Sequence, residues 1–141
     1  MRHFRMLRCV GLVLLGWTLV AQTMGPVERV VKVHFDGNIA DTVKLYDKLN
    51  QFGRERNLRF VVAEDYEFRI ATVSGRDRVT DMLSGAGAEA KAAVLTPDCK
   101  LLFIVARAGR LTQSGALNAL AKEIVKQLSF HLKAQEIRQA K

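Results

Sequence analysis

The sequence predicts a small two-layer α/β (α+β) domain, in which two helices cover one face of a mixed sheet. Three observations carry this prediction: short segments that alternate between apolar and polar residues, one helical segment between the first two of them, and a long helical segment near the end. Period-two alternation is typical of half-buried strands, and apolar residues three and four apart are typical of helices. The predicted order is β-α-β-β-β-β-α. The helical crossover makes the first two strands parallel, and the later strands form an antiparallel meander.

The first half of the domain contains three predicted strands and one helix. Residues 29–35 form the first strand, and Asn38 is the predicted N-cap of a helix that reaches Phe52, because an Asn side chain accepts a hydrogen bond from a first-turn amide. Two further strands are predicted at 58–63 and 66–73, with Tyr66 on the same face as the apolar residues that follow it. The polar alternates should lie on the sheet face away from the helices: Lys32, His34, Glu67 and Arg69.

The second half begins with residues 74–88, whose Ser, Gly, Asp and Arg content predicts a flexible loop. Predicted strands at 91–95 and 100–106 then flank Thr96-Pro-Asp-Cys99. This tetrapeptide favours a hairpin turn, because Pro presets the bend and Asp bonds back to the main chain. A long helix begins near Ser114. Its apolar stripe consists of Leu117, Leu120, Ala121, Ile124 and Leu128.

The beginning of the chain has the layout of a secretory signal. A mostly apolar run of 13 residues, 9–21, follows three arginines: Arg2, Arg5 and Arg8. The run is shorter than the roughly 20 apolar residues that a membrane-spanning helix needs. We therefore predict a signal peptide at 1–21 and a periplasmic or secreted protein. Because Leu19 is large for a cleavage site, an uncleaved inner-membrane anchor with the domain facing outward is the alternative.

The rest of the chain is long enough for one domain. We assign 22–28 to a linker, 29–132 to a single domain, and 133–141 to a polar tail that either frays or continues as solvated helix. Without residues 1–21 the chain keeps 120 residues, and the formal charge falls from +8 to +5 with the loss of three arginines. This charge favours acidic partners or solubility in general, and it specifies no ligand.

The chemistry-bearing side chains do not form a recognisable catalytic set. The histidines outside the signal, His34 and His131, have no partner at metal-ligand spacing, and the serines lack a nucleophile-elbow motif. We expect no catalytic residues, no metal site and no cofactor. Cys99 is alone after signal removal, which leaves an intermolecular disulfide as its one route to pairing.

Two glycine-containing segments have the composition of anion-binding loops. Gly85-Ala-Gly87-Ala-Glu-Ala90 has the letters of a dinucleotide fingerprint, but it precedes a strand instead of following one, so we interpret it as loop. Gly109–Gly115 precedes the last helix, where free amides attract negative charge. Capping of the helix by a hydroxyl explains the same residues equally well. The candidate anion-binding residues here are Arg107, Arg110, Thr112 and Ser114.

A family resemblance rests on three segments in order: Ala63-Glu-Asp-Tyr-Glu-Phe-Arg-Ile70, the hairpin at 96–100 and the helix at 116–128. Together with the opening strand and helix, they resemble the small periplasmic domains of envelope-assembly proteins over residues 29–130. Examples are the amino-terminal domain of TolB, the curli secretion lipoprotein and the penicillin-binding-protein activator lipoproteins. The resemblance implies a non-enzymatic role in binding envelope partners, and it carries over no catalytic residues.

These observations predict an exported, non-enzymatic envelope protein that acts as a binding or assembly module. A protein partner would use the polar sheet face or an exposed strand edge, where amides and carbonyls are already aligned. The alternative is a domain that binds small anions or an anionic polymer at the start of the last helix. An enzyme with an unrecognised site is a third hypothesis. Export argues against nucleic acid, membrane contact is expected only through an uncleaved first segment, and the oligomeric state stays open.

Overall fold

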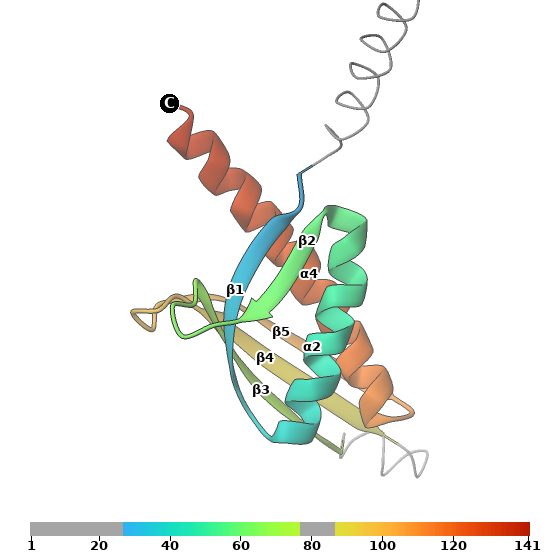
Figure 1. Ribbon diagram of the computed structural model, residues 1–141. Helices are drawn as coiled ribbons and strands as arrows, with labels where there is room; N and C mark the ends of the chain where they lie inside the picture. Colours follow the sequence, from blue (N-terminus) through green and yellow to red (C-terminus); the bar gives the residue numbers. More distant parts are fainter. Residues whose placement is uncertain (1–26, 77–86) are drawn as a thin grey trace, which may run out of the picture.

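The computed structural model describes residues 27–76 and 87–141, and it confirms the predicted mixed α/β, two-layer class. The described residues form a five-stranded sheet, two long helices and one 3₁₀ turn (Figure 1). The elements are β1 (Arg29–Asp36), α2 (Ile39–Gly53), η1 (Arg54–Arg56), β2 (Leu58–Val62), β3 (Phe68–Arg76), β4 (Ala88–Leu95), β5 (Leu101–Arg110) and α4 (Gln113–Gln139). The predicted signal and most of the predicted loop at 74–88 lie outside the described residues.

The strands lie in the order β2-β1-β3-β4-β5. β1 is parallel to β2, as predicted, and it is also parallel to β3 on its other side. The predicted meander is confirmed, since β3, β4 and β5 pair antiparallel in sequence order. The chain must therefore pass from one side of β1 to the other between β2 and β3.

A stagger between β2 and β3 makes this crossing short. β2 pairs with residues 29–33 of β1, whereas β3 pairs with residues 33–36. Parallel strands that lie fully side by side need a long return connection, usually a helix. Because β3 starts at the level where β2 ends, residues 63–67 are enough to cross β1.

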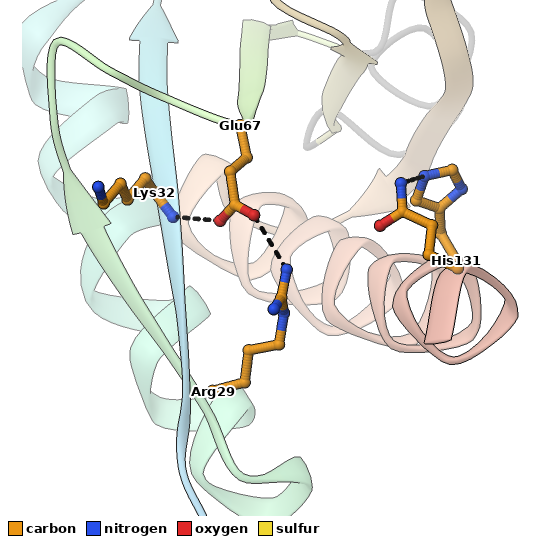
Figure 2. Close-up of polar contacts among 5 residues, drawn as sticks. Arg29, Lys32, Glu67 and His131 are labelled. Atoms are coloured by element: carbon orange, nitrogen blue, oxygen red, sulfur yellow. Dashed lines mark hydrogen bonds and ion pairs between the residues drawn. The ribbon is translucent and has the colours of Figure 1, made fainter. Parts of the chain in front are cut away.

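Glu67 fixes the end of this crossing segment against β1. Its backbone amide donates to the Lys32 carbonyl at 2.9 Å, and its carboxylate accepts from the Lys32 amide at 3.2 Å and pairs with the Arg29 guanidinium at 2.9 Å (Figure 2). β3 does not extend along this part of β1, so the Glu67 carboxylate takes the place of a strand carbonyl and accepts the hydrogen bond of the Lys32 amide. Strand amides point within the sheet plane, so the prediction that Glu67 lies on the open sheet face is wrong.

Tyr66 also departs from its predicted place. It precedes β3, and its ring stacks on that of His34 with 5.1 Å between centroids. Phe68 and Ile70, by contrast, are buried beneath the helices. Tyr66 therefore lies with the polar side chains of the open face, because the chain is still crossing β1 at this residue.

The core lies between the sheet and the two helices, which pack on each other and on one sheet face. All five residues of the predicted apolar stripe of α4 are buried. At the end of α2, Gly53 is also buried, and a Cβ atom there would lie 2.7 Å from the Leu58 carbonyl oxygen. The largest fully buried side chains are Phe60, Leu45, Leu49, Ile70, Leu117, Leu120, Ile124 and Leu128.

Both long helices begin at polar caps. Asn38 Oδ1 accepts from the Asp41 amide at 2.7 Å, as predicted, and Thr112 Oγ1 accepts from the Gly115 amide at 3.0 Å. α4 continues to Gln139, so the predicted polar tail is mostly solvated helix, which extends beyond the sheet (Figure 1).

β3, β4 and β5 are longer than predicted. Pairing with β4 keeps β3 extended to Arg76, through a Ser and a Gly that favour loops when read locally. Likewise, β4 begins at Ala88 and β5 ends at Arg110, because cross-strand pairing extends strands through residues of weak β propensity.

Candidate anion-binding site

A pocket of about 270 Å³ lies between η1, the end of β5 and the first half of α4. Five cationic residues line it: Arg56, Arg107, Arg110, Lys122 and Lys126. Two carboxylates, Glu55 and Glu123, also line it, and this set leaves a net charge of +3. The apolar part of the lining comes from Phe52, Ala119 and Val125. The pocket therefore combines an excess of positive charge with a surface that excludes part of the solvent.

A β-bulge brings two of the predicted residues to the same pocket. Residues three apart on a regular strand point to opposite faces of the sheet. Ala88 pairs with Arg110, however, and Ala90 pairs with Arg107, so β5 has one extra residue in this interval. Gly109 lies in the interval with a φ of +71°, a left-handed conformation that glycine adopts without strain. The extra residue changes the alternation, and both arginines line the pocket.

Arg107 is partly neutralised within the pocket. Its Nη2 lies 3.0 Å from Glu123 Oε2 on α4, and its Nη1 donates to the Ala106 carbonyl at 2.8 Å. Across residues 27–76 and 87–141, no carboxylate lies within 4.0 Å of the cationic groups of Arg110, Lys122 or Lys126. Among the described residues, no ion pair therefore neutralises these three side chains.

Arg56 closes the pocket from the side of η1. Its Nη1 lies 3.5 Å from Ser129 Oγ on α4, and its guanidinium carbon lies 5.9 Å from the centre of the Phe130 ring. These contacts hold an otherwise exposed side chain next to α4. Arg56 could not be predicted as a site residue, because nothing in the local sequence of a helix end indicates which helix lies beside it.

Lys122 and Lys126 were also missed, although the sequence contains a signal for them. They are four residues apart on a predicted helix, so they share one face. That face borders the buried stripe, and the basic residues of β5 lie across from it. The local pattern of these lysines is the same as that of an ordinary solvated face.

The structure separates the four predicted anion-binding residues. Arg107 and Arg110 line the pocket, whereas Thr112 and Ser114 do not. The Thr112 hydroxyl is occupied as the N-cap of α4, and Ser114 is exposed in the first turn. The candidate site is therefore the groove beside the helix and not the start of the helix.

The other singled-out side chains lie elsewhere. His131 packs edge-on against Phe68 with 5.9 Å between centroids. Its Nε2 lies 3.2 Å from Gln135 Nε2, a contact that Figure 2 marks. Cys99 is an exposed free thiol at the hairpin, so its pairing with a second chain stays a prediction. Within the described ranges, no three His, Cys, Asp or Glu side chains lie close enough together to hold a metal ion.

An ion pair orders the polar part of the open sheet face. Arg69 donates a hydrogen bond to Asp36, and His34 Nε2 lies 3.4 Å from the same carboxylate. The hydrogen bond from Arg69 is the main reason that the pKa of Asp36 falls below its ordinary value of 3.8, while burial opposes the shift. The Asp36 carboxylate therefore stays charged at neutral pH and holds β1 and β3 together at this level.

Part of the remaining open face is apolar, which the sequence did not predict, beside the ion pair of Lys91 and Glu89 on β4. Val73 on β3 is 71% exposed and Ile104 on β5 is 64% exposed. Next to them, Ala71 on β3 pairs with Ala93 on β4, which pairs with Ile104. A shallow depression of about 440 Å³ covers this region. Of the expected polar residues, Lys32 and His34 on β1 and Arg69 at the start of β3 lie at the other end of this face.

The fold and the pocket define a two-layer α+β domain with a basic groove between a helix and a sheet edge. No family model matches the sequence, and no curated protein is significantly similar to it. In the part of the chain that the structure describes, no helix is both long and apolar enough to span a bilayer.

Proposed function

We propose that this chain is an exported, non-enzymatic binding module that holds an anionic ligand in the pocket between η1, β5 and α4. The observation that carries the proposal is the convergence of Arg110, Lys122 and Lys126, each without a carboxylate within 4.0 Å among the described residues, on one partly apolar pocket. Like charges that lie together without counter-charges repel each other. An anionic ligand relieves this repulsion, and binding is the simplest use of such an arrangement.

The side chains have complementary roles in this proposal. The guanidinium of Arg110 offers a planar pair of donors to an oxyanion, whereas Lys122 and Lys126 provide mobile point charges from α4. Arg107 is held by Glu123 and contributes less charge, but it shapes the wall of the pocket. Because the lysines are exposed, the binding should be reversible and should weaken with added salt.

Inorganic phosphate is the first probe for this proposal. We would follow its titration by NMR in the wild-type protein, in Arg110→Ala and in the matched control Arg138→Ala. Arg138 is exposed in the last turn of α4 and does not line this pocket. We expect Arg110→Ala to weaken binding about tenfold, the scale of one charge-assisted hydrogen bond, and the control to leave it unchanged. Equal effects of the two substitutions, or no binding to wild type, would refute the proposal.

A second candidate function uses the open face of the sheet. The exposed Val73 and Ile104 flank a shallow apolar depression, which supports the binding of a protein partner there. This is the protein-binding role that the resemblance to envelope-assembly domains implies. A photo-crosslinker placed at Ile104 should capture one defined partner in the envelope, while the same group at Lys44 on α2 should capture none. Identical products at both positions would argue against this role.

A further inference from the structure

A second, smaller pocket continues the basic groove along α4. It has a volume of about 150 Å³, and its lining includes Arg29, Asn57, Ser129 and Lys133. Arg56 lines both pockets, so the two adjoin at this side chain. The groove therefore does not end at the site proposed above.

The lysines of the groove share one face of α4. Lys122, Lys126 and Lys133, together with Ser129, are separated by intervals of four, three and four residues. At about 100° per residue these positions lie within roughly 60° of each other around the helix. The first and last lysines are eleven positions apart, which corresponds to a rise of about 16 Å. The cations consequently form a row along the helix and not a cluster around one point.

We propose that the ligand of this groove is a linear polyanion, whose successive anionic groups lie along α4 from Arg110 to Lys133. The inference rests on the proposed function and deepens it. A single small anion requires one pocket, whereas two adjoining small pockets with a shared arginine match repeated charges on one chain. A polymer also gains from multivalency, since each further anionic group binds at a high effective concentration once the first is held.

The charge along the groove exceeds what the protein neutralises itself. The two pockets contain seven cations, and three carboxylates, Glu55, Glu123 and Glu136, line them. Arg29 pairs with Glu67 and Arg107 pairs with Glu123. The other five cations of the groove have no carboxylate of residues 27–76 or 87–141 within 4.0 Å: Arg56, Arg110, Lys122, Lys126 and Lys133.

The test uses long-chain polyphosphate as the polymeric probe and inorganic phosphate as the monomer. We expect polyphosphate to bind roughly a hundredfold more tightly than phosphate, through multivalency. The logarithm of its association constant should fall with the logarithm of salt concentration with a slope of about −3.5, from five contacts at about 0.7 each. Lys133→Gln should weaken polyphosphate binding and reduce this slope by about 0.7, with no effect on phosphate. Lys44→Gln, the same charge change at an exposed position of α2 outside the groove, should change neither.

The outcomes separate this inference from the proposed function. If phosphate binds through Arg110 but polyphosphate binds no more tightly and Lys133→Gln is silent, the polymer inference fails and the anion pocket stands. If neither probe binds, both fail. Stronger binding to phosphatidylglycerol vesicles than to polyphosphate would overturn the inference in favour of a membrane surface. Circular dichroism of each variant checks that the fold is intact.

Discussion

Arg107 on β5 and Glu123 on α4 form an ion pair at 3.0 Å within an otherwise basic pocket. The side chain of Glu123 is the less exposed partner, at 23% against 36% for Arg107. This pair links the sheet to the helix, and it also places one negative charge where an anionic ligand would lie. The negative charge of Glu123 therefore stabilises the contact between β5 and α4 but lowers the affinity of the pocket for anions.

Glu123→Gln should increase the affinity for inorganic phosphate. The substitution removes a repulsive charge and releases the Arg107 guanidinium, while the amide can still accept a hydrogen bond. We expect a gain of roughly two- to fivefold, the scale of a partly exposed charge pair. Glu64→Gln makes the same charge change on the crossing segment and should have no effect. A loss of affinity in Glu123→Gln would mean that the ion pair positions Arg107 for the ligand.

Gly109→Ala should weaken phosphate binding and destabilise the protein together. A φ of +71° at this residue is unfavourable for alanine by about 1 kcal/mol. Relief of this strain would alter the bulge that brings Arg107 and Arg110 to one pocket. Gly75→Ala is the control, because a Cβ atom at Gly75 meets nothing within 4 Å. Chemical denaturation and a phosphate titration report the two effects separately, and unchanged binding would dissociate the bulge from the site.

Asp36 should make the protein sensitive to acid. The pKa of Asp36 is lowered in the folded state, mainly by the hydrogen bond from Arg69, so the carboxylate contributes stability above its unfolded pKa. This contribution is lost as the pH falls through the lower, folded value, from about pH 4 downward. Asp36→Asn should therefore lose less stability than wild type across this range, as measured by urea denaturation at each pH. Asp47→Asn, on exposed α2, should behave as wild type.

Cys99→Gly should stabilise the hairpin. Cys99 has a φ of +63° in the loop that joins β4 and β5, and its amide donates to the Thr96 carbonyl at 3.0 Å. Glycine adopts this left-handed conformation without the cost of about 1 kcal/mol that a Cβ atom brings. Cys99→Ser keeps the Cβ atom and removes the thiol, so its melting temperature should stay near that of wild type. A gain in both variants would point to the thiol and not to the backbone.

Export is the prediction that intact mass and fractionation test directly. In a diderm bacterium, we expect a soluble periplasmic product of 120 residues in place of the full 141. The full-length chain in the membrane fraction would establish the alternative of an uncleaved anchor. A full-length cytosolic product would refute export, and nucleic acid would then become the natural ligand for a basic groove.

The elements that could be predicted from the sequence are those with local causes. Asn38 marks the start of α2 and the Thr96–Cys99 tetrapeptide marks the hairpin, because caps and turns depend on a few adjacent residues. The position of β3 beside β1 depends instead on the stagger of two strands against a third. No local pattern contains that information, and the misplacement of Tyr66 and Glu67 followed from it.

The candidate site shows the same division. Arg107 and Arg110 could be predicted as anion-binding residues, because they are basic residues next to a glycine-containing segment before a helix. Their convergence depends on the bulge around Gly109, which reverses the expected alternation of β5. The contribution of Arg56 depends on the packing of η1 against α4. This is a tertiary contact, since Arg56 and Ser129 are 73 residues apart in the sequence.

The central place of β1 limits how the domain can be shortened. β2 is an edge strand whose one strand neighbour is β1, and β3 pairs with the other side of the same strand. A truncation or a proteolytic cleavage within 29–36 would therefore not remove an edge strand but separate β2 from β3, β4 and β5. β1 begins only a few residues after the predicted signal peptide at 1–21. Cleavage at the predicted position would leave β1 complete, whereas cleavage further along the chain would separate β2 from the rest of the sheet.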